Sequence, residues 1–525
     1  MTKQINQLIS GALILTIAGM VSKILSALYR IPLQNLTGDL GFYTYQQIYP
    51  IIATVIILSL YGFPLAVSRI TAEHLKNGQT LSYRYEFIPL WIILFIINGV
   101  IAACLYFLAP FLARGMHDEY LIIPLQLSGV LFLLIPFLAL FRGVFQAELH
   151  MKQTAYSQIV EQIVRVKIII VGAWFIFKGN IKVRFIAEIG VVSSIMGMLV
   201  ALVFLAILFL RRYPLHQSVQ LPQRQINWRK YTIAIITFGM IAALNHLTLV
   251  FIQLIDVLTL VPQLIKTGLS PLMAMEAKGI FDRGIPLIQF GAVLGSSFAL
   301  AFVPSIKKQN HMEQKQSIQD AISISVYVAA GATIGLIVIY DDVNRLLFKD
   351  ELGTSVLQIL ALSIFLLSLS ITGSAILQAY GYVKWTVMSL VIALVVKITL
   401  NFMFIPYWKT HGSAAATVVS LLCLTVLIIG GIYRKVRFSP WKQIRFWPFV
   451  GAGGTMSLCL LAVKLFFQSV QFSRMGLFIY VICLVLFGAF IYLIILLRYK
   501  VIDERKISAL PFSAQLLLLQ KVVSK

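Results

Sequence analysis

Charged residues are scarce in this sequence, and acidic residues are the scarcest. Of the 525 residues, only 12% are Asp, Glu, Lys or Arg, whereas 59% are hydrophobic. This composition excludes a soluble globular protein, which would need more polar residues to cover its surface. Apolar runs of about 20 residues, the length that crosses a bilayer, recur along the whole chain. The sequence therefore predicts an all-α polytopic membrane protein.

The apolar runs lack the period-two alternation of membrane β-strands, which excludes a β-barrel. Counted by length, they give about 14 transmembrane helices, the first near residues 8–29 and the last near 476–497. The amino-terminal run has the shape of a signal peptide, but no small-residue cleavage site precedes Lys23 and Arg30. We therefore expect an uncleaved first span.

Signatures of catalysis are also lacking. The four cysteines lie inside apolar runs, the seven histidines have no ligand-like spacing, and no GxxxxGK[ST] motif is present. Neither a disulfide framework, a metal site, a cofactor nor a built-in ATPase is indicated. The connections between spans are too short for an extra folded domain, which disfavours a membrane glycosyltransferase. We expect a protein without covalent chemistry and without catalytic residues.

The scarcity of acidic residues leaves a net charge of +24, from 43 basic and 19 acidic residues. Such an excess can indicate nucleic-acid binding, but here its placement explains it. Basic clusters at 211–230 and 434–445 both fall on the side that the positive-inside rule makes cytoplasmic. They also suit an anionic inner leaflet. We predict a cell-membrane protein with both termini cytoplasmic and no nucleic-acid partner.

An internal repeat appears when the sequence is shifted by 232 residues. Residues 142–167 then align with 374–399, and Arg165 falls on Lys397, so two rare intramembrane cations coincide. An even number of predicted spans separates the copies, so both halves enter the membrane in the same direction. Two six-helix lobes related by a pseudo-twofold axis along the membrane normal are expected.

The repeat sets the predicted domain boundaries. Residues 1–225 form the amino-terminal six-helix lobe and residues 226–440 the carboxy-terminal six-helix lobe. Residues 441–525 add two transmembrane helices and a cytoplasmic tail. Within that tail, residues 507–523 could lie along the inner interface as an amphipathic segment.

The stretch VEQIVRVKIII, residues 160–170, carries three charges into an apolar run. A charge near the middle of a bilayer costs several kcal/mol, so such groups usually face a bundle interior or a wet cavity. Glu161 and Arg165 are four residues apart on one face, which permits an ion pair that only fixes helix packing. Lys167 points elsewhere on the helix and has no local partner.

Other intramembrane charges suggest a cavity that is rich in cations. Lys23 and Arg30 lie two turns apart on one face, which favours an anionic ligand over interfacial anchoring. Arg283 lies beside a glycine and a proline in FDRGIPLIQFG, where irregular backbone is tolerable only against protein or water. The predicted substrate-binding cations are Lys23, Arg30, Arg165, Arg283 and Lys397, and the cavity carboxylates or ion-coupling candidates are Glu161, Asp256 and Asp282.

An excess of cations inside a membrane suits a phosphate-bearing substrate, because Arg and Lys pair strongly with phosphate oxygens. An exporter of organic cations should show the opposite sign of charge.

Several motifs resemble a known family: YRIPL (29–33), GFPLAVS (62–68), SQIVEQIVRV (157–166), DRGIPL (282–287) and GSAAATVVS (412–420). In this order they resemble the polysaccharide transport branch of the multidrug/oligosaccharidyl-lipid/polysaccharide exporter superfamily. The likeness is greatest to the stage V sporulation protein B group, which is related to MurJ-type lipid II flippases, and it covers nearly all of the chain.

The resemblance implies two lobes and two additional helices, with lipid-linked sugars flipped by alternating access. It places Lys23 at the family's first cavity cation and Arg283 at the cation of the eighth helix, whereas Arg30 falls one residue out of register. The expected substrate is an undecaprenyl-diphosphate-linked peptidoglycan precursor or cell-wall oligosaccharide in a Gram-positive bacterium, held by these cations in contact with membrane lipids. Two alternatives remain open, namely a cation-coupled drug or metabolite antiporter and a non-transporting scaffold that recruits cell-wall synthesis enzymes.

Overall fold

The computed structural model of the protein describes residues 2–76, 81–214, 226–300, 311–436, 445–503, 507 and 513–523. These residues form helices, turns and short connections and contain no strand, which confirms the predicted all-α class. Segments 215–225 and 437–444, which carry part of the two basic clusters, lie outside the described residues, as does much of the predicted amphipathic tail.

Ten helical segments of the described chain are long and apolar enough to cross a membrane. Two of them, Ala18–Lys76 and Val383–Val436, have 59 and 54 residues and so exceed a single crossing. The multi-pass membrane architecture predicted from the apolar runs is confirmed. The count of about 14 spans stays a prediction.

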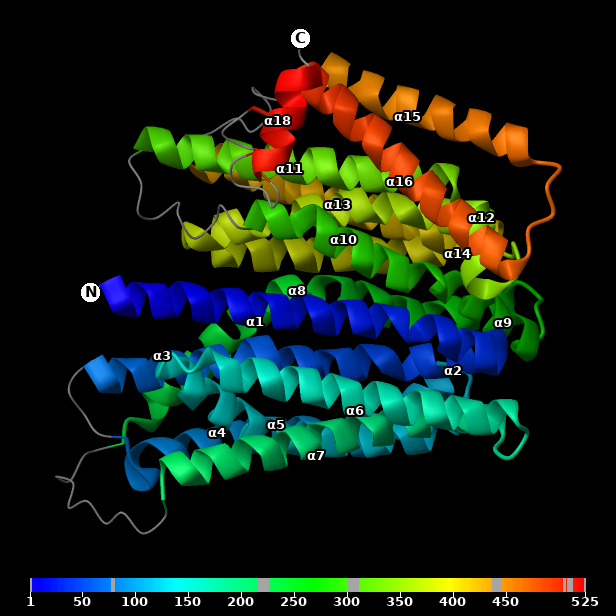
Figure 1. Cartoon of the computed structure of the whole chain (residues 1–525). Helices are drawn as coiled ribbons and strands as arrows, with labels where there is room; N and C mark the ends of the chain where they lie inside the picture. Colours follow the sequence, from blue (N-terminus) through cyan, green and yellow to red (C-terminus); the bar gives the residue numbers. More distant parts are fainter. Residues whose placement is uncertain are drawn as a thin grey trace. The chain divides into compact units, whose positions relative to one another are not determined.

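The chain divides into two compact units, residues 1–279 and 280–525. Within the first unit, α4 packs against α5 and α6 against α7, and α5 also contacts α3 and α7 (Figure 1). Buried apolar side chains such as Phe42, Ile135 and Leu205 fill the space between these helices. The long helices of this unit are α1 (Thr2–Leu28), α2 (Arg30–Ile57), α3 (Phe63–Lys76), α4 (Ile88–Gly115), α5 (Ile122–Ala147), α6 (Met151–Phe177), α7 (Ile186–Arg212) and α8 (Trp228–Lys266).

In the second unit, α13 is central, because it packs against α10, α11 and α14, while α15 pairs with α16. The helices here are α10 (Gly284–Leu300), α11 (His311–Val338), α12 (Tyr340–Phe348), α13 (Thr354–Ala379), α14 (Val383–Gly431), α15 (Phe446–Phe467), α16 (Arg474–Arg498) and α18 (Ser513–Val523). Helix α9 (Pro271–Asp282) leads into this unit. The lobe boundaries at 225 and 440 concern the repeat of helices and stay a prediction, although α8 packs against α2, α3 and α4 of the first unit.

Several helices are interrupted at positions that matter for the polar side chains. A π-helical turn, Leu58–Gly62, joins α2 to α3, and such wide turns are frequent at functional sites. Helix α14 folds at Lys409, whose φ of 48° is left-handed. Arg283 is the single residue between α9 and α10, which confirms the irregular backbone predicted at this position.

The helix ends reproduce the predicted repeat. Helix α5 begins and ends 232 residues before α13, and α6 begins 232 residues before α14. The offset found from the side chains is therefore also the offset of the helical hairpins, which supports an internal repeat.

Candidate functional site

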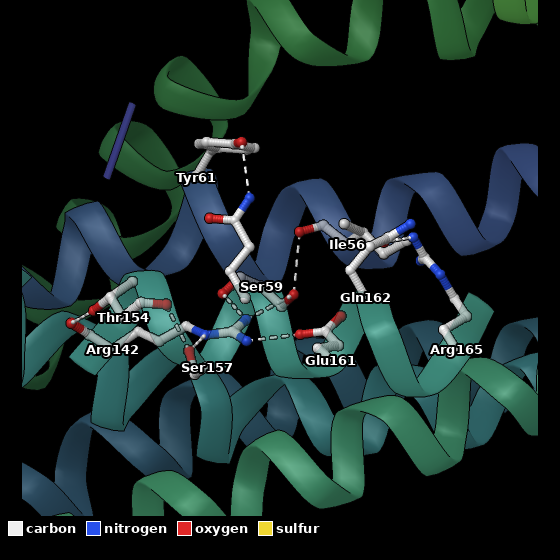
Figure 2. A network of polar contacts seen from close by, with 10 residues as sticks. Ile56, Ser59, Tyr61, Arg142, Thr154, Ser157, Glu161, Gln162 and Arg165 are labelled. Atoms are coloured by element: carbon white, nitrogen blue, oxygen red, sulfur yellow. Dashed lines mark hydrogen bonds and ion pairs between the residues drawn. The ribbon is translucent and has the colours of Figure 1, made fainter. Parts of the chain in front are cut away.

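The most extensive polar network of the first unit is built around Arg142 of α5 (Figure 2). Its Nη2 donates to Glu161 Oε2 of α6 at 2.6 Å, and its Nη1 donates to the carbonyl oxygen of Ser59 at 3.0 Å. Its Nε donates to Ser157 Oγ at 3.1 Å. Both members of the ion pair are buried, so the pair is held away from water and joins α5, α6 and the π-helical turn.

The predicted ion pair between Glu161 and Arg165 does not form. Arg142 takes the carboxylate instead, and Arg165 donates from Nη2 to the side-chain oxygen of Gln162 (Figure 2). The physical reason is that Arg142 is fully buried and reaches Glu161 directly from the neighbouring helix, at a length typical of charge-assisted bonds. Arg165 is itself buried, and its Nε has no hydrogen-bond partner among the described residues.

Four polar residues of α6, Gln158, Glu161, Gln162 and Arg165, form one buried row at the i, i+3, i+4, i+7 spacing of a helix face. A close approach of α7 backs this row, because a Cβ at Gly197 would lie 2.7 Å from the carbonyl oxygen of Glu161. Lys167 lies off the row and is exposed. The row faces the interior of the unit, and Lys167 does not.

Lys23 belongs to a second polar group, formed with Tyr61 of the π-helical turn and His246 of α8. Its Nζ lies 3.5 Å from His246 Nδ1 and 5.8 Å from the centre of the Tyr61 ring. The Tyr61 and His246 rings stack at 4.2 Å, and Gln158 Nε2 donates to the Tyr61 hydroxyl at 3.4 Å. Lys23 is exposed, so its ammonium group is open to a ligand while Tyr61 connects it to the row on α6.

Arg30 begins α2 and is fully buried. Its guanidinium stacks on the Tyr49 ring at 3.7 Å, but none of its three nitrogens has a hydrogen-bond partner among the described residues. The Tyr45 hydroxyl bonds to Tyr29 and interacts electrostatically with both Arg30 and Arg165. Two buried guanidinium groups thus lie around one tyrosine cluster, and the described chain supplies no carboxylate to pair with either.

In the second unit, Arg283 is fully buried and makes a two-pronged contact with Asp350. Its Nη1 and Nη2 donate to Asp350 Oδ1 and Oδ2 at 2.6 and 3.0 Å. Partial burial opposes ionisation of Asp350, but the hydrogen bonds from Arg283 and the Leu352 N–H, together with the charge of Arg283, hold its pKa below the usual range. Arg283 therefore has an internal counter-charge, unlike Arg165.

Replacing Asp350 with asparagine should reduce the stability of the second unit in a pH-dependent way. A carboxylate with a lowered pKa stabilises the fold fully above its ordinary value of 3.8, and this contribution disappears as the pH falls through the lowered value. In thermal unfolding, the difference between wild type and Asp350→Asn should be constant near pH 7 and shrink below pH 3.8. A difference that grows on acidification would contradict the assignment.

Lys397 is also fully buried and lies on the first arm of α14. Its Nζ donates to the Ser413 carbonyl oxygen at 3.0 Å and to Thr417 Oγ1 at 2.7 Å, both beyond the fold at Lys409. It therefore fastens the two arms of α14 together. Asp256 of α8 and Asp282 of α9 are both buried.

The structure brings together three of the five predicted cations in the first unit: Arg30 and Arg165 meet at the Tyr45 cluster, and Lys23 connects to the α6 row through Tyr61. Reasoning from the sequence missed Arg142 and Asp350. Arg142 had a signal, since it interrupts the apolar run LLIPFLALFRGVF. Asp350 had none, because it lies in a polar connection. Among the described residues, no group of three or more His, Cys, Asp or Glu is placed to hold a metal ion.

Comparison with known proteins places this geometry in a family context. The uncharacterized membrane protein YabM of Bacillus subtilis is 31% identical over 96% of this chain and 95% of its own length. Lipid II flippase MurJ of the same organism is 24% identical, over 79% of this chain and 81% of its own length. Stage V sporulation protein B, also from B. subtilis, is 22% identical over 97% of this chain and 99% of its own.

Solved structures agree on the fold. Lipid II flippase MurJ in an inward closed conformation superposes with a TM-score of 0.66 at 13% identity, covering 92% of this chain and 98% of that one. An inward-facing multidrug resistance MATE family transporter of the MOP superfamily gives 0.59 at 16% identity, covering 81% and 98%. The family described as polysaccharide biosynthesis protein matches residues 8–309, more than half of the sequence. With its helical membrane fold and its intramembrane cations, this chain belongs to the polysaccharide biosynthesis protein family.

Proposed function

We propose that this protein is a flippase that moves an undecaprenyl-diphosphate-linked cell-wall precursor or oligosaccharide across the cytoplasmic membrane by alternating access. The headgroup would cross between the lobes while the lipid tail stays in the bilayer. Both termini would be cytoplasmic. Energy would come from an ion gradient, the membrane potential or removal of the product, without covalent chemistry by the protein.

The observation that carries the proposal is the uncompensated positive charge of the first unit. Arg30 and Arg165 are buried beside the Tyr45 cluster without a carboxylate partner among the described residues, and Lys23 is exposed near by sequence on α1. Burying an unpaired guanidinium is unfavourable by several kcal/mol, so a site of this kind favours an anion. A diphosphate fits, because guanidinium groups bind phosphate oxygens in a planar, two-pronged geometry.

The known relatives favour a lipid-linked substrate over a soluble one. One relative and one solved structure are named as lipid II flippases, and the matching family is named for polysaccharide biosynthesis. We infer that Lys23 meets the diphosphate first, since it is exposed, and that Arg30 and Arg165 bind it when the tyrosine cluster opens.

The predicted cations of the second unit have a different role in this proposal. Arg283 would exchange Asp350 for the diphosphate during transport, and Lys397 would add positive charge while holding α14. Glu161 is committed to Arg142, so we propose Asp256 and Asp282 as the carboxylates for ion coupling.

A drug or metabolite antiporter is the second candidate, because the fold is shared with a multidrug transporter. Such a protein needs a carboxylate free to attract an organic cation. In the first unit, Glu161 already binds Arg142, and the neighbouring groups are cationic, which disfavours this alternative. A scaffold for cell-wall synthesis enzymes would not require buried cations at all.

Reconstitution into vesicles tests the proposal. Protein-containing vesicles should move a fluorescent undecaprenyl-diphosphate sugar between leaflets, whereas empty vesicles should not. The same vesicles should not accumulate an organic cation along an ion gradient. Cation transport without movement of the lipid-linked sugar would contradict the proposal and support the antiporter.

A further inference from the structure

A groove on the first unit lies outside the polar network. It runs between α6 and α7, has a volume of about 390 Å³, and is lined by apolar side chains that include Val171, Phe175 and Val192. These three side chains are 38–53% exposed, so the groove is open. It extends along α6 from residue 168 to 175, about 10 Å at the rise of an α-helix, or a third of the hydrocarbon thickness.

The groove lies on a surface made for lipid. The exposed face of α6 carries Tyr156, Ile163, Trp174 and Phe177, and the exposed face of α7 is equally apolar. Membrane helices present such faces to acyl chains, since polar side chains turn inward. The aromatic residues near the ends of the helices are typical of the membrane–water boundary.

One carboxyl group interrupts this apolar lining. Glu188, in the first turn of α7, lines the groove, and its Oε2 is buried and has no hydrogen-bond partner among the described residues. A buried polar atom without a partner is unfavourable by about 1–3 kcal/mol, so an occupant that supplies one is favoured. In a groove that opens to hydrocarbon the neutral acid is the stable form, and it offers an O–H donor.

Two exposed lysines follow at the end of the groove where α6 is connected to α7. Lys178 is the first residue after α6, and its Nζ lies 5.7 Å from the Trp174 ring; Lys182 follows Ile181, which lines the groove. From this end inward, the groove thus presents cations, then a hydrogen-bond donor, then an apolar channel. A glycerophospholipid presents its phosphate, ester carbonyls and acyl chain in the same order.

We propose that the α6–α7 groove binds one bilayer phospholipid. Lys178 and Lys182 contact its phosphate, Glu188 donates to an ester carbonyl, and an acyl chain fills the space beside Val171 and Val192. The site depends only on the membrane location of the protein and not on the proposed transport of a lipid-linked sugar.

Native mass spectrometry of the purified full-length protein tests the site, with diacyl phosphatidylglycerol as the probe. Val192→Trp, which fills the groove, should weaken binding of one lipid at least about tenfold, since roughly two methylene groups lose their contact. Val200→Trp is the matched control, because Val200 is also an exposed valine of α7 but does not line the groove. It should bind within about twofold of wild type.

The role of Glu188 has its own readout. Glu188→Leu should weaken the diacyl lipid about fivefold, the effect of one lost neutral hydrogen bond, whereas Glu188→Gln keeps a donor and should bind normally. The diether analogue, which lacks the carbonyls, should bind equally to all three proteins. Identical affinities in wild type and Val192→Trp would overturn the site. A Val192→Trp effect on undecaprenyl phosphate but not on phosphatidylglycerol would overturn the assigned occupant.

Discussion

Replacing Arg165 with glutamine should lower the rate of lipid-linked sugar translocation in vesicles by about 10- to 100-fold. A hydrogen bond to a charged group contributes roughly 1.5–3 kcal/mol, and each 1.4 kcal/mol is a factor of ten. The substitution leaves the Arg142–Glu161 pair in place, so the protein should still insert and fold. The measurement is the initial rate of headgroup movement, normalised to the amount of folded protein in the vesicles.

Lys167 offers a matched control on the same helix. Lys167→Gln removes the same charge two residues further along α6, but Lys167 is exposed and lies off the buried row. Its translocation rate should stay within about twofold of wild type, because the exposed charge has no part in the buried site. Equal losses in both variants would mean that total charge matters and that Arg165 has no specific role.

Replacing Glu161 with leucine should be the most destabilising single change in the first unit. It leaves Arg142 buried without its counter-charge, and breaking a buried ion pair from one side costs about 3–5 kcal/mol. The free energy of unfolding in detergent, followed as a function of added denaturant, measures the loss.

The double variant Arg142→Leu with Glu161→Leu distinguishes an unpaired charge from lost packing. Replacing both members of a buried pair by apolar residues is often neutral, so the double variant should recover most of the stability. Glu73→Gln, which breaks an exposed pair with Lys230, should change stability by less than about 1 kcal/mol. A double variant as unstable as Glu161→Leu would show that the network supports the fold through shape rather than charge.

The fold was largely predictable because a bilayer imposes length and polarity on every helix. Apolar runs of about 20 residues identify spans with little ambiguity. The repeat was predictable for a related reason, since intramembrane cations are rare enough for Arg165 and Lys397 to mark an alignment that the helix ends reproduce. The division between compact units at 279 was not predictable, because it depends on where α8 packs.

The site was predictable only in its residue types. The sequence indicated that Glu161 and Arg165 share a helix face, which they do, but a shared face does not decide which partner wins. Arg142 reaches Glu161 from a neighbouring helix, and that contact depends on how the α5–α6 hairpin closes and on the π-helical turn that presents the Ser59 carbonyl. No local pattern carries this information. Lys167 shows the converse, since its position off the row was predictable from helical spacing alone.

The most direct measurement of the central claim is the affinity of the purified wild-type protein for farnesyl diphosphate and for farnesol, its neutral counterpart. If buried cations of the first unit bind the diphosphate of the substrate, the charged ligand should bind at least about tenfold more tightly, and the difference should shrink in Arg165→Gln. Equal affinities for the two ligands, or tighter binding of an organic cation, would contradict it.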